Sequence, residues 1–256
     1  MTNPRLEEIR KLINEKPFVS QKELEALFPD VSPMTVRRDT IYLEKQNELL
    51  RVRGGVRGIK FIASSVEDNF FTRSLEYVDE KTRIARAAMR FVFDGRAIFI
   101  DAGSTASEFA KLFSGRRVSV VTTSPNVAIE LSRVQGPAVT LVGGMLNREN
   151  LSIAGTQAID FLKSVNLDVA FLSSSGYSPD SGFTCGNYYD CEIKKFIISK
   201  VRQVVMMMDC SKLDKVLPYT FCTEEDVNIL ITDRALPTEV QKVMKAGKVQ
   251  TVCAAN

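Results

Sequence analysis

The sequence predicts an α/β protein in two parts, a small helical module followed by a larger domain built on a mainly parallel sheet. Three observations carry this prediction. The first sixty residues hold three short amphipathic stretches and then an arginine-rich pair of strands around a Gly-Gly step. From residue 97 onward, short apolar runs alternate with amphipathic stretches. The length of 256 residues suits one small and one larger domain.

The first two helices are indicated by apolar spacing and by a capping signal. A first helix is predicted from apolar residues that share one face and from a proline that should end it: Leu6, Ile9, Ile13 and Pro17. Residues 20–23, Ser-Gln-Lys-Glu, form a capping-box pattern. We expect a second, short helix to begin there and to bury Leu24, Leu27 and Phe28.

The third helix carries the most informative residues of the chain. Ser32 can cap it, and Pro33 suits its first helical position. Arg37 and Arg38 lie near its beginning, away from the predicted inward face. That face is formed by residues spaced i, i+4 and i+7: Val36, Thr40 and Leu43.

Two arginine-studded strands are predicted after this helix. Arg51 and Arg53 alternate with Leu50 and Val52, and residues 54–55, Gly-Gly, suit a tight hairpin turn. An isolated Arg-Arg pair would indicate only a solvated basic surface, but a helix with early arginines followed by such a hairpin is typical of a winged helix-turn-helix on DNA. The predicted DNA contacts are Ser32, Met34, Thr35, Arg37, Arg38, Arg51, Arg53 and Arg57.

The charge distribution supports this assignment. The net charge is +3, and the whole surplus lies in residues 1–60, where 12 Lys/Arg face 9 Asp/Glu; the other residues hold 22 of each. Attraction to phosphate needs such a local concentration more than a high overall charge. The modest total argues against a protein that coats nucleic acid without specificity.

Composition excludes several classes of protein. No apolar run approaches the roughly 20 residues that span a bilayer, and the N-terminus lacks the apolar core of a signal peptide. Five cysteines without C-x-x-C spacing indicate reduced thiols and a cytoplasmic location. The chain has no histidine, which excludes histidine-based catalysis and every histidine-containing metal site. We expect no metal and no cofactor.

We place the DNA-binding domain at residues 1–57, a linker at 58–77 and the α/β domain at 78–256. The linker contains Phe70-Phe71, which could dock it on a domain. A helix is expected over residues 79–93, ending before Asp94-Gly95. Strands of a parallel sheet covered on both faces are then predicted from apolar runs at residues 97–100, 118–121, 138–142, 169–172, 204–208 and 227–231.

Small polar residues and glycines follow five of these runs, at residues 101–105, 122–126, 143–144, 173–176 and 209–212. Ligands of open parallel sheets bind beyond the carboxyl ends of the strands, and such loops expose backbone N–H groups that suit an anion. One loop of this kind is weak evidence, since Ser and Thr cap helices everywhere, but five predict a polyol-phosphate site. Lys212 would add a point charge for the phosphate, unless it is a surface lysine paired with Asp209 or Asp214.

Over essentially its full length the chain resembles the DeoR family of bacterial transcriptional regulators. The resemblance rests on three groups of motifs. The N-terminal group is residues 32–39, Ser-Pro-Met-Thr-Val-Arg-Arg-Asp, with 43–46 and 51–55. The linker group is Arg73, Glu80-Lys81 and Ile84-Ala85. The sensor group is residues 101–105, 143–144, 168–171, 182–184, 194–195, 209–212 and 231–233.

The resemblance implies a repressor of a carbohydrate-utilisation operon that is released by a phosphorylated sugar or sugar alcohol, and a homo-oligomer, dimer or tetramer. The sequence departs from the family pattern at Thr40, usually Leu, at Arg53, usually His, at Asn47-Glu48, where a Gly is usual, and at Asp190, often Glu. The candidate effector-binding residues are Asp101, Gly103, Ser104, Thr105, Thr123, Ser124, Gly143, Gly144, Gly176, Asp190, Lys194 and Lys212.

The α/β domain is also similar to pentose-phosphate isomerases, which need a carboxylate to move a proton beside a carbonyl. Where those enzymes have a motif resembling Asp-Gly-Ala-Asp, residues 172–175 here are Leu-Ser-Ser-Ser. A site that keeps its binding residues without these carboxylates indicates a sensor of sugar-phosphate-isomerase type and not an enzyme. The alternative is an isomerase that carries a DNA-binding module, in which Asp101, Asp190 or Glu192 would act. An architectural DNA binder would leave the polar loops without a purpose.

Overall fold

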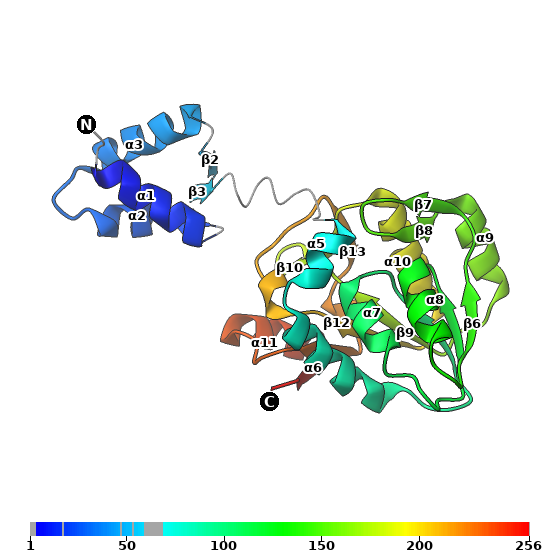
Figure 1. The fold of residues 1–256 in the computed structure, drawn as a ribbon. Helices are drawn as coiled ribbons and strands as arrows, with labels where there is room; N and C mark the ends of the chain where they lie inside the picture. Colours follow the sequence, from blue (N-terminus) through cyan, green and yellow to red (C-terminus); the bar gives the residue numbers. More distant parts are fainter. Residues whose placement is uncertain (1–3, 17, 47, 53, 59–68, 256) are drawn as a thin grey trace. The chain divides into compact units, whose positions relative to one another are not determined.

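The computed structural model describes residues 4–16, 18–46, 48–52, 54–58 and 69–255. It divides into two compact units, Met1–Val66 and Glu67–Asn256 (Figure 1). The expected linker, residues 58–77, lies partly outside the described residues, because 59–68 are not among them. Its described part contains a short helix, α5 (Phe70–Leu75), that the sequence did not predict. The boundaries at residues 57 and 77 stay predictions.

The N-terminal unit has the three predicted helices, α1 (Pro4–Glu15), α2 (Gln21–Leu27) and α3 (Pro33–Lys45). The capping box at α2 is confirmed: Ser20 Oγ accepts from Glu23 N at 3.2 Å, and Glu23 Oε2 accepts from Ser20 N at 2.9 Å. The core contains the predicted faces of α1 and α3, with Ile9, Ile13, Val36, Thr40 and Leu43 buried. The prediction that Leu27 is buried was wrong: it is 39% exposed, because only Leu24 of α2 faces the core.

The predicted hairpin consists of β2 (Leu49–Val52) and β3 (Gly55–Gly58) and is called the wing below. A third strand, β1 (Val19–Ser20), pairs with β3, which gives the order β1-β3-β2. Gly54 has φ +88°, as a tight turn of this kind favours. A side chain at Gly55 would start 2.1 Å from the carbonyl oxygen of Val19, so glycine is needed for β1 and β3 to pair.

The C-terminal unit is built on seven parallel strands in the order β15-β14-β12-β9-β4-β5-β6. Six lie at the predicted apolar runs: β4 (Ala97–Ile100), β5 (Ser119–Thr122), β6 (Ala138–Leu141), β9 (Val169–Ser173), β12 (Gln203–Met207) and β14 (Ile229–Thr232). The edge strand β15 (Gln250–Cys253) was not predicted. Its residues are mostly exposed, so they need no apolar run.

Helices cover both faces of this sheet, as predicted. One face packs against α6 (Val78–Ala88), α7 (Ser104–Ala110) and α8 (Pro125–Ser132). The other packs against α9 (Thr156–Ser164), α10 (Tyr188–Lys200) and α11 (Thr238–Ala246). Alternate strand residues enter the two cores: Ile98 and Ile100 face α6 and α7, whereas Phe99 lies in the core with α9 and α10.

Short elements surround this framework. The predicted helix over residues 79–93 is α6 followed by a 3₁₀ turn, η2 (Met89–Phe91), and it ends before Asp94-Gly95 as expected. Two more 3₁₀ turns are η3 (Cys210–Lys212) and η4 (Glu224–Asp226). Two small antiparallel sheets, unpredicted, are β7 (Met145–Asn147) with β8 (Ser152–Ala154), and β10 (Gly176–Ser178), β11 (Gly182–Cys185) and β13 (Tyr219–Cys222). Within the described residues, no helix is long and apolar enough to cross a membrane.

Candidate functional sites

The first candidate site is the exposed side of α3. Met34 is 59% exposed, and Arg37 and Arg38 are exposed, as the helical spacing predicted. Ser32 caps the helix, since its hydroxyl accepts a hydrogen bond from the backbone N–H of Thr35 at 3.3 Å. Arg38 follows Met34 and Thr35 by about one helical turn, so these side chains share one stretch of surface.

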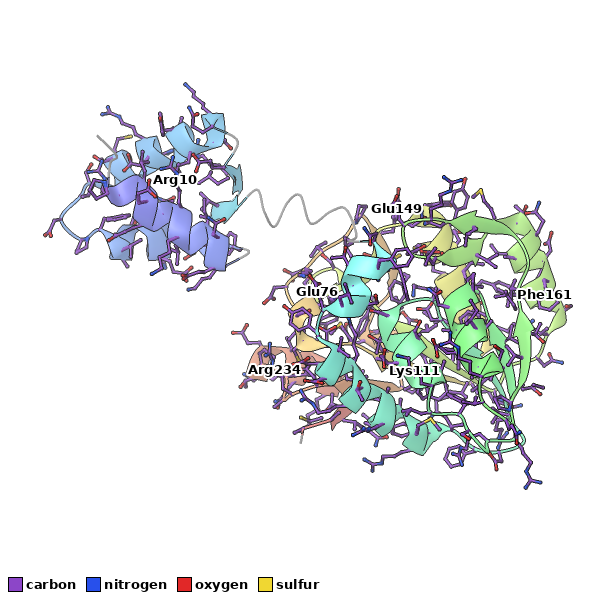
Figure 2. All side chains as sticks on the ribbon, in the orientation of Figure 1. Arg10, Glu76, Lys111, Glu149, Phe161 and Arg234 are labelled. Atoms are coloured by element: carbon purple, nitrogen blue, oxygen red, sulfur yellow. The ribbon has the colours of Figure 1, made fainter. Side chains whose placement is uncertain are left out.

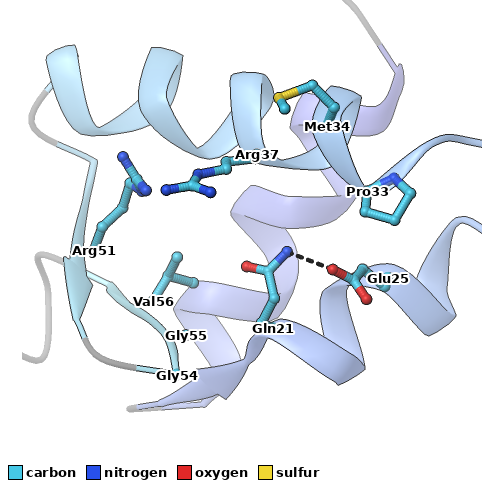
Figure 3. Close-up of a pocket in the computed structure, with 9 residues that line it drawn as sticks. All are labelled: Gln21, Glu25, Pro33, Met34, Arg37, Arg51, Gly54, Gly55 and Val56. Atoms are coloured by element: carbon cyan, nitrogen blue, oxygen red, sulfur yellow. Dashed lines mark hydrogen bonds between the residues drawn. The ribbon is translucent and has the colours of Figure 1, made fainter.

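A pocket with a volume of about 370 Å³ separates α3 from the wing (Figure 3). The guanidinium groups of Arg37, on α3, and Arg51, on β2, point into it toward each other. Arg51 lies near one carboxylate, that of Glu44, at 3.9 Å, and its backbone N–H donates to the same side chain at 2.9 Å. Two cations that face each other across an open pocket suit an oxyanion such as a phosphate.

Two ion pairs hold the framework behind this surface. Arg5 Nε donates to Asp39 on α3 at 2.9 Å. Arg10 donates to both carboxylate oxygens of Glu48, at 2.6 and 2.7 Å, which joins α1 to the residue before β2. These hydrogen bonds lower the pKa of Glu48 and raise that of Arg10. Glu48 is one of the departures from the family pattern, and its role here is to fix the start of the wing.

The remaining predicted DNA contacts are only partly described. Arg53 lies outside the described residues, and so does the side chain of Arg57, whose backbone belongs to β3. The side chains of Leu50 and Val52 also lie outside the described part of the chain. The predicted alternation of arginine with apolar side chains in the wing therefore stays a prediction.

The second candidate site is a narrow pocket at the carboxyl ends of β4 and β9. Asp101, which follows β4, accepts hydrogen bonds from the backbone N–H and hydroxyl of Ser173 at 2.9 and 3.1 Å. Lys194 reaches the pocket from α10, forms an ion pair with Asp101 and donates to the carbonyl of Ser173 at 2.9 Å. Burial favours the neutral amine, but the surrounding acidic groups, Asp101 foremost and with it Asp190, together outweigh burial and raise the pKa of Lys194.

A second carboxylate, Asp190, also lines the pocket. It lies in the first turn of α10, where the side chain of Asn187 accepts a hydrogen bond from its backbone N–H at 3.2 Å. Asn150 and Ser152 both donate hydrogen bonds to the Asp190 carboxylate. Thr123, which follows β5, also lines the pocket. The lining is therefore rich in hydroxyls and carboxylates, groups that can bind the hydroxyls of a sugar or polyol.

Three cations gather beside these groups. Arg73, on α5, lines the pocket together with Asp101 and Lys194. Lys81, on α6, is buried, and this burial lowers its pKa to about 8. Burial also lowers the pKa of Lys212; Asp209 opposes this shift, while the nearby charges of Lys215 and Arg73 add to it. Arg73 thus lines the polar pocket and also interacts electrostatically with both lysines.

Only part of the predicted effector site comes together. Asp101, Thr123, Asp190 and Lys194 line the pocket. Gly103 lies beside it, since an added side chain would start 2.9 Å from Ser173 Oγ, and Ser104 and Thr105 follow in the first turn of α7. Lys212 lies near Arg73 but does not line the pocket. The other four, Ser124, Gly143, Gly144 and Gly176, do not line it either.

Local structure accounts for two of these four residues. Ser124 caps α8 and accepts from the backbone N–H of Val127 at 3.3 Å. Gly176 begins β10, where a side chain would start 2.4 Å from the carbonyl oxygen of Lys215. Their contact with an effector stays a prediction.

Several residues of the pocket were not among the candidates. Arg73 did carry a signal, because it belongs to the linker motif of the family resemblance, but it was placed in the linker, residues 58–77. Lys81, which does not line the pocket, belongs to the same motif. Asn150 and Ser152 lie before and within a short strand, β8, and nothing in the local sequence marked them. Among the described residues, no cluster of Cys, Asp and Glu side chains is arranged to hold a metal ion.

Comparison with known families gives two matches. The model of a DeoR-like helix-turn-helix domain matches residues 5–61, and that of the DeoR C-terminal sensor domain matches residues 76–234. An uncharacterised HTH-type transcriptional regulator, YulB of Bacillus subtilis strain 168, is 32% identical over 246 residues, covering 96% of this chain and 94% of YulB. The glycerol-3-phosphate regulon repressor of Escherichia coli K12 is 31% identical over 243 residues, covering 94% and 95%.

A third relative is the HTH-type transcriptional repressor GlcR of Bacillus subtilis strain 168. It is 32% identical over 209 residues, which is 82% of this chain and 80% of GlcR. Among solved structures, ribose 5-phosphate isomerase A of Methanocaldococcus jannaschii is similar over 54% of this chain and 55% of its own, with 20% identity and a TM-score of 0.40.

Proposed function

This chain belongs to the DeoR family of DNA-binding transcriptional regulators, and we propose that it represses a carbohydrate- or polyol-utilisation operon until a phosphorylated sugar or sugar alcohol binds its C-terminal pocket. It is a regulator and not an enzyme. The observation that carries the proposal is the composition of the C-terminal pocket. Carboxylates and hydroxyls suited to a polyol lie there beside cations suited to a phosphate. The name of the glycerol-3-phosphate regulon repressor supports an effector of this class.

The geometry of α3 and the wing supports different roles for the two arginines. Arg37 faces Arg51 across the pocket, so this pair binds one DNA phosphate. Arg38 lies outside that pocket, beside Met34 and Thr35, and reads a base edge. Ser32 contacts the DNA backbone at the start of the helix, while Arg53 and Arg57 complete the phosphate contacts of the wing.

The effector is bound from two sides. Asp101, Asp190 and Thr123 bind its hydroxyls, and the ion pair with Lys194 holds Asp101 in place. Its phosphate lies toward Lys212 and the loop of Gly103, Ser104 and Thr105. Gly143, Gly144, Gly176 and Ser124 shape neighbouring turns. The protein acts as a homo-oligomer, dimer or tetramer, because a repressor commonly reads two half-sites of one operator.

An operator-binding titration tests this function. Fluorescence anisotropy at fixed salt is measured with DNA from the regulator's own promoter region, against a panel of phosphorylated sugars and polyols and their unphosphorylated counterparts. We expect one phosphorylated compound to release the DNA and its unphosphorylated form to fail, because a ligand relieves repression only by binding the low-affinity state more tightly. Release by an unphosphorylated sugar alone would contradict the proposed effector class. Light scattering of the free protein tests the oligomer.

A further inference from the structure

The short helix α5 brings a charged residue of the connecting region into the effector pocket. Arg73 is 9% exposed and lines the pocket with Asp101 and Lys194. α5 packs against α7, the helix that begins beside the pocket (Figure 1). It is also the first described element after residues 59–68, which join the wing to the C-terminal unit in the chain. Arg73 therefore lines the pocket and also belongs to the first helix after the chain segment that leads from the DNA-binding unit.

Little of α5 is buried. Its only buried residues are Phe70 and Arg73, whereas Phe71 and Leu75 are 67% and 82% exposed. Glu149 and Glu76 mark its two ends (Figure 2). The backbone N–H of Phe70 donates to the carbonyl of Glu149 at 2.6 Å. Segments that bury so little surface open at a low cost in free energy. Since Arg73 is one of the two buried residues of α5, a change at Arg73 should affect how firmly this helix is held.

The C-terminal end of α5 depends on a cation of the same cluster. The ammonium group of Lys81 donates hydrogen bonds to the carbonyl oxygens of Arg73 and Glu76. Lys81 also lies within electrostatic range of Asp209 and Lys212. An ammonium has three donors, and a phosphate is a stronger acceptor than a peptide carbonyl. An anion that binds this cluster would draw Lys81 away from the end of α5.

The pocket has no room for a ligand in its present form. Its volume is about 10 Å³, about the least space that holds one water molecule. The Asp101–Lys194 pair is fixed by hydrogen bonds to Ser173, and Asp190 is fixed by Asn150 and Ser152. Of the two cations that line the pocket, Lys194 comes from the 13-residue helix α10, and Arg73 comes from the 6-residue helix α5, which has two buried residues. A ligand can enter most readily if Arg73 and α5 give way.

We propose that Arg73 is an anion-binding residue of the effector site and that displacement of its helix α5 passes effector binding to the chain segment that leads to the DNA-binding unit. The ligand class is a phosphate-bearing anion, the class already assigned to this pocket, so the inference rests on the proposed function. A ligand shifts a two-state equilibrium only by its different affinity for the two states. Here the difference arises because the phosphate binds Arg73 and Lys81 only when they leave their present positions.

Hydrogen–deuterium exchange of the full chain, with and without inorganic phosphate, tests the site. We expect phosphate to accelerate exchange over residues 69–76 in the wild-type protein. Arg73→Met, which keeps the apolar stem and removes the charge, should abolish this response. Arg86→Met, at an exposed arginine on α6, should keep it. The anion site is overturned by no phosphate response in the wild type, by slower exchange over 69–76, or by a full response in Arg73→Met.

The coupling has its own test, and it needs no ligand. Phe70→Ala removes the apolar anchor of α5 and should therefore imitate the effector, lowering operator affinity about tenfold or more in its absence. Thermal unfolding of the same variant checks that the C-terminal unit stays folded. Operator affinity equal to wild type, together with faster exchange over 69–76, would overturn the coupling. Because the exchange experiment uses phosphate without DNA, its result is independent of whether a sugar phosphate releases the operator.

Discussion

The two pockets of this molecule hold their cations in opposite ways. In the N-terminal unit Arg37 is exposed, and the Arg51 side chain keeps 31% of its exposure with its carboxylate partner at 3.9 Å. In the C-terminal unit the side chains of Lys194 and Asp101 are 7% and 4% exposed and bonded directly to each other. Exposed ion pairs add little to folding stability, whereas a buried pair depends on both members. The first pocket can exchange water for DNA phosphate at small cost, whereas loss of either charge in the second leaves its partner buried and unpaired.

The largest effect expected from this difference is on stability. Lys194→Met leaves the Asp101 carboxylate buried without its cation and should lower the free energy of unfolding by about 3–5 kcal/mol. Urea denaturation followed by tyrosine fluorescence measures this loss of stability. Of the 6 tyrosines, only Tyr42 lies in the N-terminal unit, and the others lie in the C-terminal unit. Lys195→Met, at the exposed neighbouring lysine, is the control. Equal costs for the two variants would remove the contrast between the pockets.

The next effect concerns the phosphate end of the C-terminal pocket. Lys212→Ala should leave operator binding by the free protein unchanged. It should weaken the releasing sugar phosphate roughly ten- to a hundredfold, since a hydrogen bond to a charged group contributes about 1.5–3 kcal/mol. The measurement is the operator titration with effector, with Lys245→Ala on the exposed side of α11 as control. Release of the mutant at an unchanged concentration would show that Lys212 lies outside the site.

The pH dependence separates the pockets further. Lys81, with a pKa of about 8, loses its charge as the pH rises from 7 to 9.5, so phosphate affinity should fall by up to about tenfold per pH unit above 8. Lys81→Met should remove much of this fall. Folding stability should change in the opposite direction. The pKa of Lys81 is about 8 in the folded protein and 10.5 in the unfolded chain, so between these two pH values the unfolded chain binds more protons. Stability should therefore rise with pH over this range. Operator binding, which uses arginines, should not follow either trend, and isothermal titration at several pH values checks this.

The smallest effects distinguish two arginines within the DNA-binding unit. Arg38→Ala should lose about 1–3 kcal/mol of discrimination between operator and random DNA. Arg51→Ala should weaken both DNAs equally and reduce the log–log salt slope by about one unit per bound subunit. Neither should change the melting temperature appreciably. If Arg51→Ala lost only its preference among DNA sequences and kept its salt slope, Arg51 and not Arg38 would be the arginine that reads a base.

Much of the fold could be predicted because its signals are local. The capping box at Ser20 and Glu23 and the cap at Ser32 depend on residues three apart, and both form as expected. Five sheet strands and the edge strand β6 coincide with apolar runs for a similar reason. Elements without such a signal were missed: α5 is short and partly exposed, and β15 is a short, mostly exposed strand at the sheet edge. Leu27 was misplaced because apolar type alone does not decide which side of a two-turn helix meets the core.

The sequence by itself determined the winged helix with exposed arginines, the parallel sheet and the edge at which a ligand should bind, because helix periodicity, strand pattern and loop composition are properties of short segments. Only the tertiary structure decided which residues of that edge meet. Asp101 and Lys194 are far apart in the chain and pair because α10 packs beside β9, the neighbour of β4 in the sheet. Arg73 enters the pocket because α5 packs on α7, whereas Gly143 and Gly144 do not line it. Such contacts between residues distant in the sequence depend on strand order and helix packing, which short segments do not encode.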